Sequence, residues 1–397
     1  MMTIFYTACV VRWNRVLMSS RNAAGRRVNM ITNHIRMLSN SSEDVLLEVK
    51  GSVGLITLNR PKALNSLDLG MVRKIHPALM DWERDENIGA IVIKGAGDKA
   101  FCAGGDVRAV AEEGISGTGG TLRRDFFKEE YQLNNAIGTL KTPYVALIDG
   151  ITMGGGVGLS VHGHFRVGTE RTLFAMPETA IGFFPDVGGS FFLPKLQGEL
   201  GTFLALTGER LRGYDVHHAG VATHYVSSDK ISELEESMLA MERPTLKTIL
   251  EMIENITKRQ SVSKITTDFS LSPYLEIINR CFAKESMEDI LYELEKEGTD
   301  WAMSKIDTIN SMSPTSLKVT LKHVREGAKL RTLFECLIME YRLSQRFMND
   351  KDFYEGIRAV LIDKDQQPKW NPSTLRAVTT EKVDSYFANL GENELEF

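Results

Sequence analysis

The sequence has few cysteines and no long apolar run. Its 397 residues include only four cysteines, and no apolar stretch is long enough to cross a membrane. The cysteines show neither the spacing of a metal site nor a disulfide framework, so we expect buried free thiols and a reducing compartment. With 43% hydrophobic and 25% charged residues, the composition is that of an ordinary globular protein.

The first 40 residues lack both lysine and acidic side chains. They contain six arginines and several serines, and the first acidic residue is Glu43. This composition is typical of a mitochondrial transit peptide, although a basic arm would also fit, so we predict a transit peptide over residues 1–42 and a location in the mitochondrial matrix. Without the six arginines, the rest of the chain has 41 basic and 52 acidic side chains, which gives a formal charge of −11. This negative charge argues against broad nucleic-acid binding.

Several common catalytic signatures are also missing. No Gly-Lys-Ser/Thr follows a glycine run, no His-Glu-x-x-His occurs, and no Gly-x-Ser-x-Gly marks a serine nucleophile. His162 and His164 are two residues apart, which is the wrong spacing for one face of a helix. We therefore expect neither a metal site nor a serine triad.

Two stretches of the chain end in glycines. A predicted strand at 144–148 leads through a turn at 149–150 to glycines 154–156 and a helix, and a predicted strand at 91–95 leads to glycines 104–105. Helix starts present unpaired backbone N–H groups, and glycine lets a ligand approach them closely. Two such N–H groups could form an oxyanion hole, but tight turns that pack helix on strand would use the same glycines.

The rest of the pattern alternates strands with helices. We predict a β-hairpin over 45–58, helices at 68–86 and 126–140, a mobile glycine-rich loop at 112–120 and a strand at 165–168. This order predicts an α/β fold with a largely parallel sheet. Past residue 197 the sequence becomes mainly helical.

Four motifs occur in an order and spacing that resemble the crotonase (enoyl-CoA hydratase/isomerase) superfamily. They are Asn-Arg-Pro-Lys-Ala-Leu-Asn at 59–65, Ala-Phe-Cys-Ala-Gly-Gly-Asp at 100–106, the glycines at 154–156, and Thr-Gly-Glu at 207–209. The resemblance implies a spiral core of ββα units over residues 43–226 that binds a coenzyme A thioester. A helical region, 227–397, would pack on that core.

Five further stretches are similar to a hydrolase branch of the superfamily. They lie at 144–160, 174–182, 184–188, 312–316 and 355–370. This closer resemblance implies water-dependent cleavage of a short β-hydroxyacyl-CoA thioester, namely 3-hydroxyisobutyryl-CoA from valine breakdown or 3-hydroxypropionyl-CoA. Coenzyme A would enter as part of the substrate, so no separate cofactor is implied.

The resemblance assigns roles to five residues. Gly105 and Gly155 match the positions whose N–H groups hold the thioester oxygen. Glu178 matches the second glutamate of the hydratases, and Glu130 matches an acidic position that contacts the substrate. Asp186 stands where hydratases have a small residue. Read without the resemblance, Glu178 and Asp186 are better explained as a helix-start residue and a turn or N-cap residue.

The family pattern breaks at Gly158, where hydratases carry a glutamate that helps to activate water. Its absence weakens hydration and favours attack on the thioester, with Glu178 as general base or nucleophile and Asp186 positioning the substrate hydroxyl or sharing proton transfers. The resemblance also places Ala103 and Lys62 near the coenzyme.

Two other functions stay open from the sequence, an enoyl-CoA hydratase or isomerase and a non-catalytic RNA-binding member of the superfamily. The acidic composition and the retained Glu178–Asp186 pair count against RNA binding. The superfamily implies trimers or hexamers, whereas the long helical region could cap those surfaces and leave a monomer or dimer.

Overall fold

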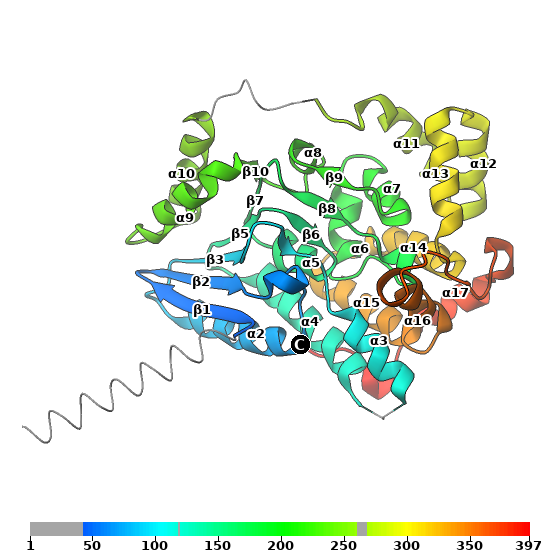
Figure 1. Ribbon diagram of the computed structural model, residues 1–397, viewed down its shortest axis with the longest axis horizontal. Coiled ribbons are helices and arrows are strands. Elements are labelled where there is room, and N and C mark those ends of the chain that lie inside the picture. The colour runs from blue at the N-terminus through cyan, green and yellow to red at the C-terminus, as the bar shows by residue number, and fades with distance from the viewer. Residues whose placement is uncertain (1–42, 118–119, 260–267) are drawn as a thin grey trace, which may run out of the picture.

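The larger of the two sheets has six strands and is mainly parallel. The computed structural model describes residues 43–117, 120–259 and 268–397, so the predicted transit segment lies outside the described residues (Figure 1). Only β1 and β2 of this sheet run antiparallel, as the predicted hairpin. The strands, in spatial order, are β1 (Val45–Lys50), β2 (Val53–Leu58), β3 (Ala90–Gly95), β5 (Tyr144–Ile148), β7 (Phe165–Gly168) and β10 (His224–Tyr225).

A second, smaller sheet contains three strands that directly follow strands of the first sheet. β3, β5 and β7 are each followed by a short strand that crosses to the second sheet, and a helical segment comes next. The chain therefore winds as a spiral of ββα units, which confirms the predicted fold class. The strands of the second sheet, in spatial order, are β4 (Ala100–Cys102), β6 (Ile151–Met153), β8 (Leu173–Ala175) and β9 (Leu211–Arg212).

Alternate residues of the first sheet build two hydrophobic cores. In β3, Ile91 and Ile93 belong to the main core, whereas Ala90 and Val92 face a second core beneath α9 (Ile231–Leu239) and α10 (Leu246–Arg259). Successive side chains of a strand point to opposite faces, so a sheet covered on both faces needs apolar residues throughout. The six residues of β2 are accordingly all buried.

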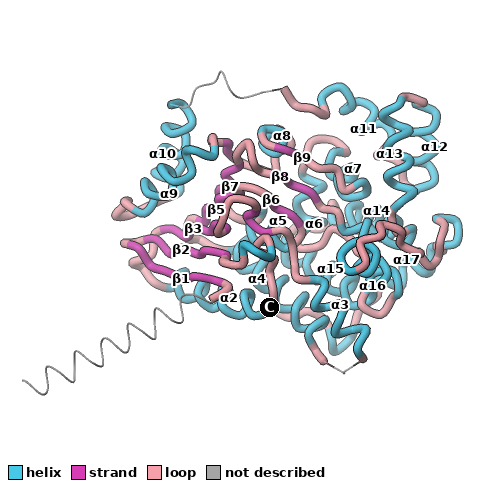
Figure 2. The backbone as a smooth tube through the Cα atoms, in the orientation of Figure 1, coloured by secondary structure: helices cyan, strands magenta, loops and turns pink. Residues whose placement is uncertain are grey.

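The C-terminal third of the chain is helical and packs against the spiral (Figure 2). Within it, α14 packs on α6 and α7, α15 packs on α4 and α6, and α16 packs on α3. None of the helices in the described ranges combines the length and apolarity needed to cross a membrane. The helices not yet given are α2 (Leu69–Arg84), α3 (Val107–Ser116), α4 (Leu122–Thr139), α5 (Gly155–Val161), α6 (Gly189–Phe192), α7 (Leu200–Thr207), α8 (Tyr214–His218), α11 (Leu275–Cys281), α12 (Met287–Glu297), α13 (Asp300–Ser311), α14 (Pro314–Gly327), α15 (Leu333–Phe347), α16 (Lys351–Ile357) and α17 (Thr380–Phe387).

Two details of the sequence interpretation were wrong. The predicted loop at 112–120 begins as helix, because α3 continues through Ser116 and ends only at Gly117, which has the left-handed φ of 62°. Gly114 is tolerated inside that helix, and a larger residue is not, because a Cβ at this position would lie 2.6 Å from the Tyr354 hydroxyl oxygen. The short strands β4 and β6 were missed, since three residues are too few to show an alternating pattern.

The cysteines of the described residues are free. Cys102, Cys281 and Cys336 are buried thiols, as expected, and Cys9 lies outside the described residues.

Candidate active site

Two glycine turns meet at one edge of the second sheet. Gly105 follows β4 and Gly155 follows β6, and these strands are parallel neighbours. Asp106 N–H donates to Leu67 O, and Leu67 N–H donates to Gly104 O, each at 2.8 Å. Because successive peptide groups in extended chain point in opposite directions, the N–H of Gly105 is turned away from Leu67. It lies 3.2 Å from the place that a Cβ on Gly155 would occupy.

Both glycine N–H groups are available to a ligand. Neither Gly105 N nor Gly155 N donates a hydrogen bond to a protein acceptor within the described residues. Gly155 is the first residue of α5, and the first N–H groups of a helix have no partner inside it. Two converging donors of this kind are what an oxyanion hole requires.

Three buried carboxyl groups surround these turns. Glu130 comes from α4, Glu178 from the 3₁₀ helix Glu178–Ile181, and Asp186 from the turn before α6; each side chain is at most 6% exposed. A Cβ on Gly155 would lie 2.6 Å from Glu130 Oε1, and one on Gly154 would lie 3.2 Å from Glu178 Oε1. Glu130 Oε1 and Glu178 Oε2 are buried without a hydrogen-bond partner among the described residues. Such atoms are costly to bury and are free to bind substrate or water.

Burial and mutual repulsion make this cluster hold protons. Burial, followed by the charges of Asp186 and Glu178, raises the pKa of Glu130 well above its usual value. Burial and the charge of Asp186 raise the pKa of Glu178 in the same way. Burial and the charge of Glu340 raise the pKa of Asp186 to about 8, even though Tyr131 O–H donates to its Oδ2 at 2.8 Å. Near neutral pH the carboxyls therefore share few negative charges and can exchange protons.

Gly158 has no room for the missing glutamate. A Cβ at this position would lie 2.7 Å from Asn134 Nδ2 and 2.7 Å from Val187 Cβ. Asn134 is fully buried, one helical turn beyond Glu130 on α4. The space that a side chain would need is thus filled from two directions.

The other two predicted residues lie on the periphery. Ala103 directly follows β4, and its N–H donates to Leu64 O at 3.0 Å, which connects the turn Pro61–Ala63 to the segment that carries Gly105. Lys62 is exposed in that turn and lines a cavity of about 230 Å³ together with Asp98 and Lys99. The structure therefore brings Gly105, Gly155, Glu130, Glu178 and Asp186 together and leaves the Lys62 side chain outside their cluster.

Sequence reasoning missed the residues that support the carboxyls. Tyr131 follows Glu130 directly and bonds to Asp186, so its position beside a predicted site residue was an available signal. His162 was considered only as a metal ligand, yet its Nε2 lies 2.7 Å from Val187 O. Glu340 and His323 lie in the helical region, where no local pattern marked them.

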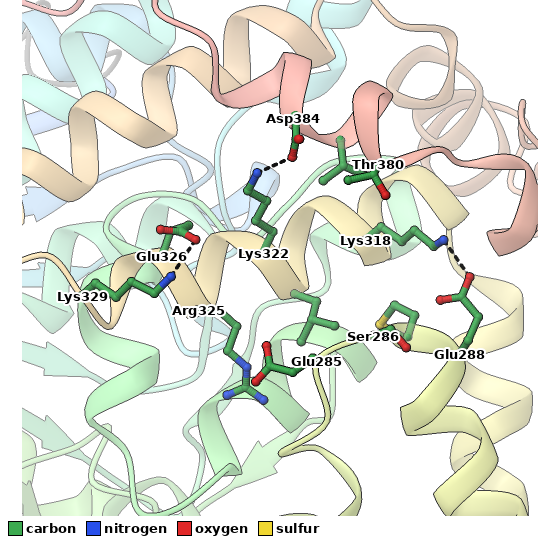
Figure 3. A pocket seen from close by; sticks show the side chains of 13 residues that line it. Glu285, Ser286, Glu288, Lys318, Lys322, Arg325, Glu326, Lys329, Thr380 and Asp384 are labelled. Carbon is green, nitrogen blue, oxygen red and sulfur yellow. Dashed lines mark hydrogen bonds and ion pairs between the residues drawn. The ribbon is translucent and has the colours of Figure 1, made fainter.

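A cavity of about 370 Å³ between α12, α14 and α17 is a weaker candidate (Figure 3). Its lysines are already neutralised, which leaves little net charge for a ligand. The ion pairs are Lys318 with Glu288, Lys322 with Asp384, and Lys329 with Glu326. In the part of the chain that the structure describes, no group of His, Cys, Asp and Glu side chains could hold a metal ion.

Comparisons with known proteins show the family of the chain. The family model described as enoyl-CoA hydratase/isomerase matches residues 53–387. The chain is 54% identical to the rat "3-hydroxyisobutyryl-CoA hydrolase, mitochondrial", covering 96% of this chain and 98% of that protein. It is 54% identical to the human protein of the same name, covering 95% and 97%. The crystal structure of a carnitinyl-CoA dehydratase from Mycobacterium thermoresistibile is similar with a TM-score of 0.82 and 41% identity, over 90% of this chain and 99% of that one.

Proposed function

The chain belongs to the enoyl-CoA hydratase/isomerase family, and we propose that it hydrolyses the thioester of 3-hydroxyisobutyryl-CoA to the free hydroxy acid and coenzyme A. This reaction belongs to valine breakdown, and 3-hydroxypropionyl-CoA is a second substrate of the same chemical class. The observation that carries the proposal is the pairing of two free backbone N–H groups with buried carboxyls that lack partners.

The glycine turns would act on the carbonyl. The N–H groups of Gly105 and Gly155 polarise the thioester carbonyl and stabilise the negative oxygen that forms when its carbon is attacked. Because both donors belong to backbone fixed by β4 and β6, they need little rearrangement during the reaction.

The carboxyls would supply the attacking group and move protons. In its ionised form, Glu178 either removes a proton from the attacking water or attacks the carbonyl itself. The second route expels the coenzyme A thiolate and forms a transient anhydride, which water then hydrolyses to the free hydroxy acid and Glu178. Asp186 positions the substrate hydroxyl or shares the proton transfers, and Glu130 contacts the acyl portion. The raised pKa of Asp186, about 8, supports proton exchange near neutral pH.

Gly158 supports cleavage of the thioester over hydration of a double bond. The resemblance implies that hydratases carry another glutamate at this position, besides the one matched by Glu178, and here Asn134 and Val187 fill the space that it would need. The site therefore lacks the carboxylate that a hydratase would have at position 158, and it contains Asp186 in addition to Glu178.

The proposed reaction also implies a cellular location and a binding partner for the protein. The relatives are named mitochondrial, and the arginine-rich, acid-free first 40 residues indicate the same location for this protein. The partner is a small acyl-CoA; the proposal includes no metal or redox cofactor, no nucleic acid and no membrane. A homo-oligomer is a hypothesis that light scattering can test.

The first experiment is to measure free-thiol release from 3-hydroxyisobutyryl-CoA by the purified protein, with crotonyl-CoA run beside it. We expect rapid thiol release, no loss of the enoyl absorbance, and a fall of roughly a thousandfold in Glu178→Gln, within the range for a lost general base. Glu129→Gln is the matched control, because Glu129 lies on the same helix as Glu130 but pairs with Arg73 at the surface. Consumption of crotonyl-CoA without thiol release would replace the proposal with a hydratase.

The two roles of Glu178 are separable by isotope. Turnover in labelled water should place heavy oxygen in the Glu178 carboxylate if an anhydride forms and water opens it at the Glu178 carbonyl carbon, and should leave Glu178 unlabelled if it acts only as a base.

A further inference from the structure

The turn that carries Asp186 has an unfavourable backbone conformation. Val187 has a φ of 52° and Gly188 a φ of 86°. A left-handed φ is unremarkable for glycine, but for a β-branched residue it is strained and needs support from its surroundings. The turn contains one local hydrogen bond, from Gly189 N–H to Asp186 O at 2.8 Å, and the strain at Val187 calls for further support.

Glu340 supplies one set of these contacts from 152 residues away in the chain. Its carboxylate on α15 accepts Gly188 N–H at 2.7 Å, and Ser190 N–H and O–H at 2.9 and 2.6 Å. Glu340 is completely buried, so these charge-assisted hydrogen bonds form away from water, where losing a partner is costly.

Two histidines complete the support. His323 on α14 is also fully buried, and its Nε2 lies 3.1 Å from Glu340 Oε1. On the opposite side of the turn, burial lowers the pKa of His162 to about 4, so the neutral ring donates from Nε2 to Val187 O at 2.7 Å. The peptide carbonyl of Val187 and the N–H of Gly188 are thus fixed from two directions.

We propose that Glu340, His323 and His162 are positioning residues for thioester hydrolysis, which hold the strained turn so that Asp186 faces Glu178 and the glycine edge. The proposal rests on the function proposed above. It assigns to the C-terminal helices a part in the reaction, although none of these three side chains needs to touch the substrate.

Glu340 also acts on Asp186 through its charge. The negative charge of Glu340 raises the pKa of Asp186, in addition to the effect of burial. Replacing Glu340 with glutamine should therefore shift the ionisation of the carboxyl cluster to lower pH. The titratable groups that interact with Asp186 are Tyr131 and Glu130 on α4, Glu178 on its 3₁₀ helix and Glu340 on α15. Next to these groups, His323 on α14 contacts Glu340, and His162 at the end of α5 contacts Val187 O.

The decisive variant is Glu340→Gln. Its amide can accept from only one of the two backbone N–H groups, so the turn loosens. We expect kcat to fall by roughly ten- to a hundredfold with KM nearly unchanged, as for a small misplacement of a reacting group. The ascending limb of the pH profile should move to lower pH. Unchanged kcat and pH profile, or a loss of thermal stability alone, would overturn the proposal.

Milder variants keep the test valid if Glu340→Gln does not fold. Ser190→Ala removes one hydrogen bond to Glu340 and should show a smaller fall in kcat. His162→Leu removes the donor to Val187, and His162→Gln should restore most of kcat because its amide can donate from a similar position. His164→Leu is the matched control, since His164 accepts from Tyr144 N–H, away from the turn. Equal losses in both leucine variants would contradict a positioning role.

A titration that needs no turnover separates this proposal from the proposed function. The carboxyl band of Asp186 can be followed by infrared difference spectroscopy, with Asp186→Asn as the reference. Its midpoint should fall in Glu340→Gln, whichever substrate the enzyme uses. A wild-type protein that releases no thiol would refute the proposed function, and an unmoved midpoint would refute the coupling of Glu340 to Asp186.

Discussion

The two sides of the active site are supported by different parts of the chain. The glycine side consists of backbone N–H groups at the ends of β4 and β6, and the register of two neighbouring strands fixes it. The carboxyl side depends on a strained turn after Asp186, held by Glu340 and His323 from α15 and α14. One side is a product of local sheet geometry, and the other of packing between distant segments.

This difference shows how a family scaffold can change its chemistry. Donors built into the backbone stay in place when side chains change, because their positions depend on strand pairing and glycine. The positions of side-chain acids depend on neighbouring elements: Asn134 and Val187 leave no room for a side chain at Gly158, and Asp186 lies on a turn that Glu340 supports. The helical C-terminal third therefore bears on the chemistry of the site as well as on stability.

The largest effect should come from breaking the glycine side. In Gly155→Ala the new methyl group would lie 2.6 Å from Glu130 Oε1 and 3.2 Å from Gly105 N, so the two donors must separate. We expect kcat to fall by roughly a hundredfold to a thousandfold, as for loss of an oxyanion donor. Gly189→Ala on the carboxyl side is the matched control, because its nearest neighbour lies 3.5 Å away and activity should change by less than about twofold. Steady-state thiol release measures both.

Asp186→Asn should change the stability of the protein in a pH-dependent way. The folded pKa of Asp186, about 8, is raised above its unfolded value, so its contribution to stability is fully present below about pH 4. That contribution is lost as pH rises toward 8, by about 1.4 kcal/mol per pH unit. The variant should therefore gain stability relative to wild type between these limits, and the gain should level off above pH 8. Thermal unfolding at a series of pH values measures the difference.

Asp350→Asn is the control of opposite sign. Burial raises the pKa of Asp350, but hydrogen bonds from Lys382 and Tyr386 outweigh it and the net shift is downward. The contribution of Asp350 to stability is present above its unfolded pKa and is lost as the pH falls through its folded pKa. The variant should therefore be less stable than wild type near neutral pH. The same sign in both variants would contradict the assignment of a raised pKa to Asp186.

Tyr131→Phe should have a smaller effect on the carboxyl side. The phenol O–H donates to Asp186 Oδ2, and its loss leaves the ring packing against Phe127 and Tyr341 intact. We expect kcat to fall roughly tenfold, the scale of one hydrogen bond to a charged group. Because this bond lowers the pKa of Asp186, the ascending limb should move to higher pH, opposite to the shift expected for Glu340→Gln. Shifts in the same direction would show that the limb does not report Asp186.

The glycine side could be largely predicted from the sequence, and the support of the carboxyl side could not. The strands 144–148 and 165–168 were predicted with the bounds that the structure shows, because apolar runs closed by turns are a local signal. Glu178 and Asp186 could be selected only through resemblance, since a lone acid after proline has many explanations. The bond from Gly188 to Glu340 has no local signature, because it depends on how α15 packs against the turn.

The smallest effect should come from Lys62, which tests where the glycine side ends. Its side chain is exposed in the turn Pro61–Ala63, which Leu64 and Ala103 tie to the end of β4. A charge at such a rim interacts through water, so Lys62→Ala should raise KM by no more than about threefold and leave kcat unchanged. Lys74→Ala, exposed on α2, is the control and should change neither. A fall in kcat would mean that Lys62 reaches the reacting group in the substrate complex. The turn Pro61–Ala63 would then belong to the glycine side of the active site.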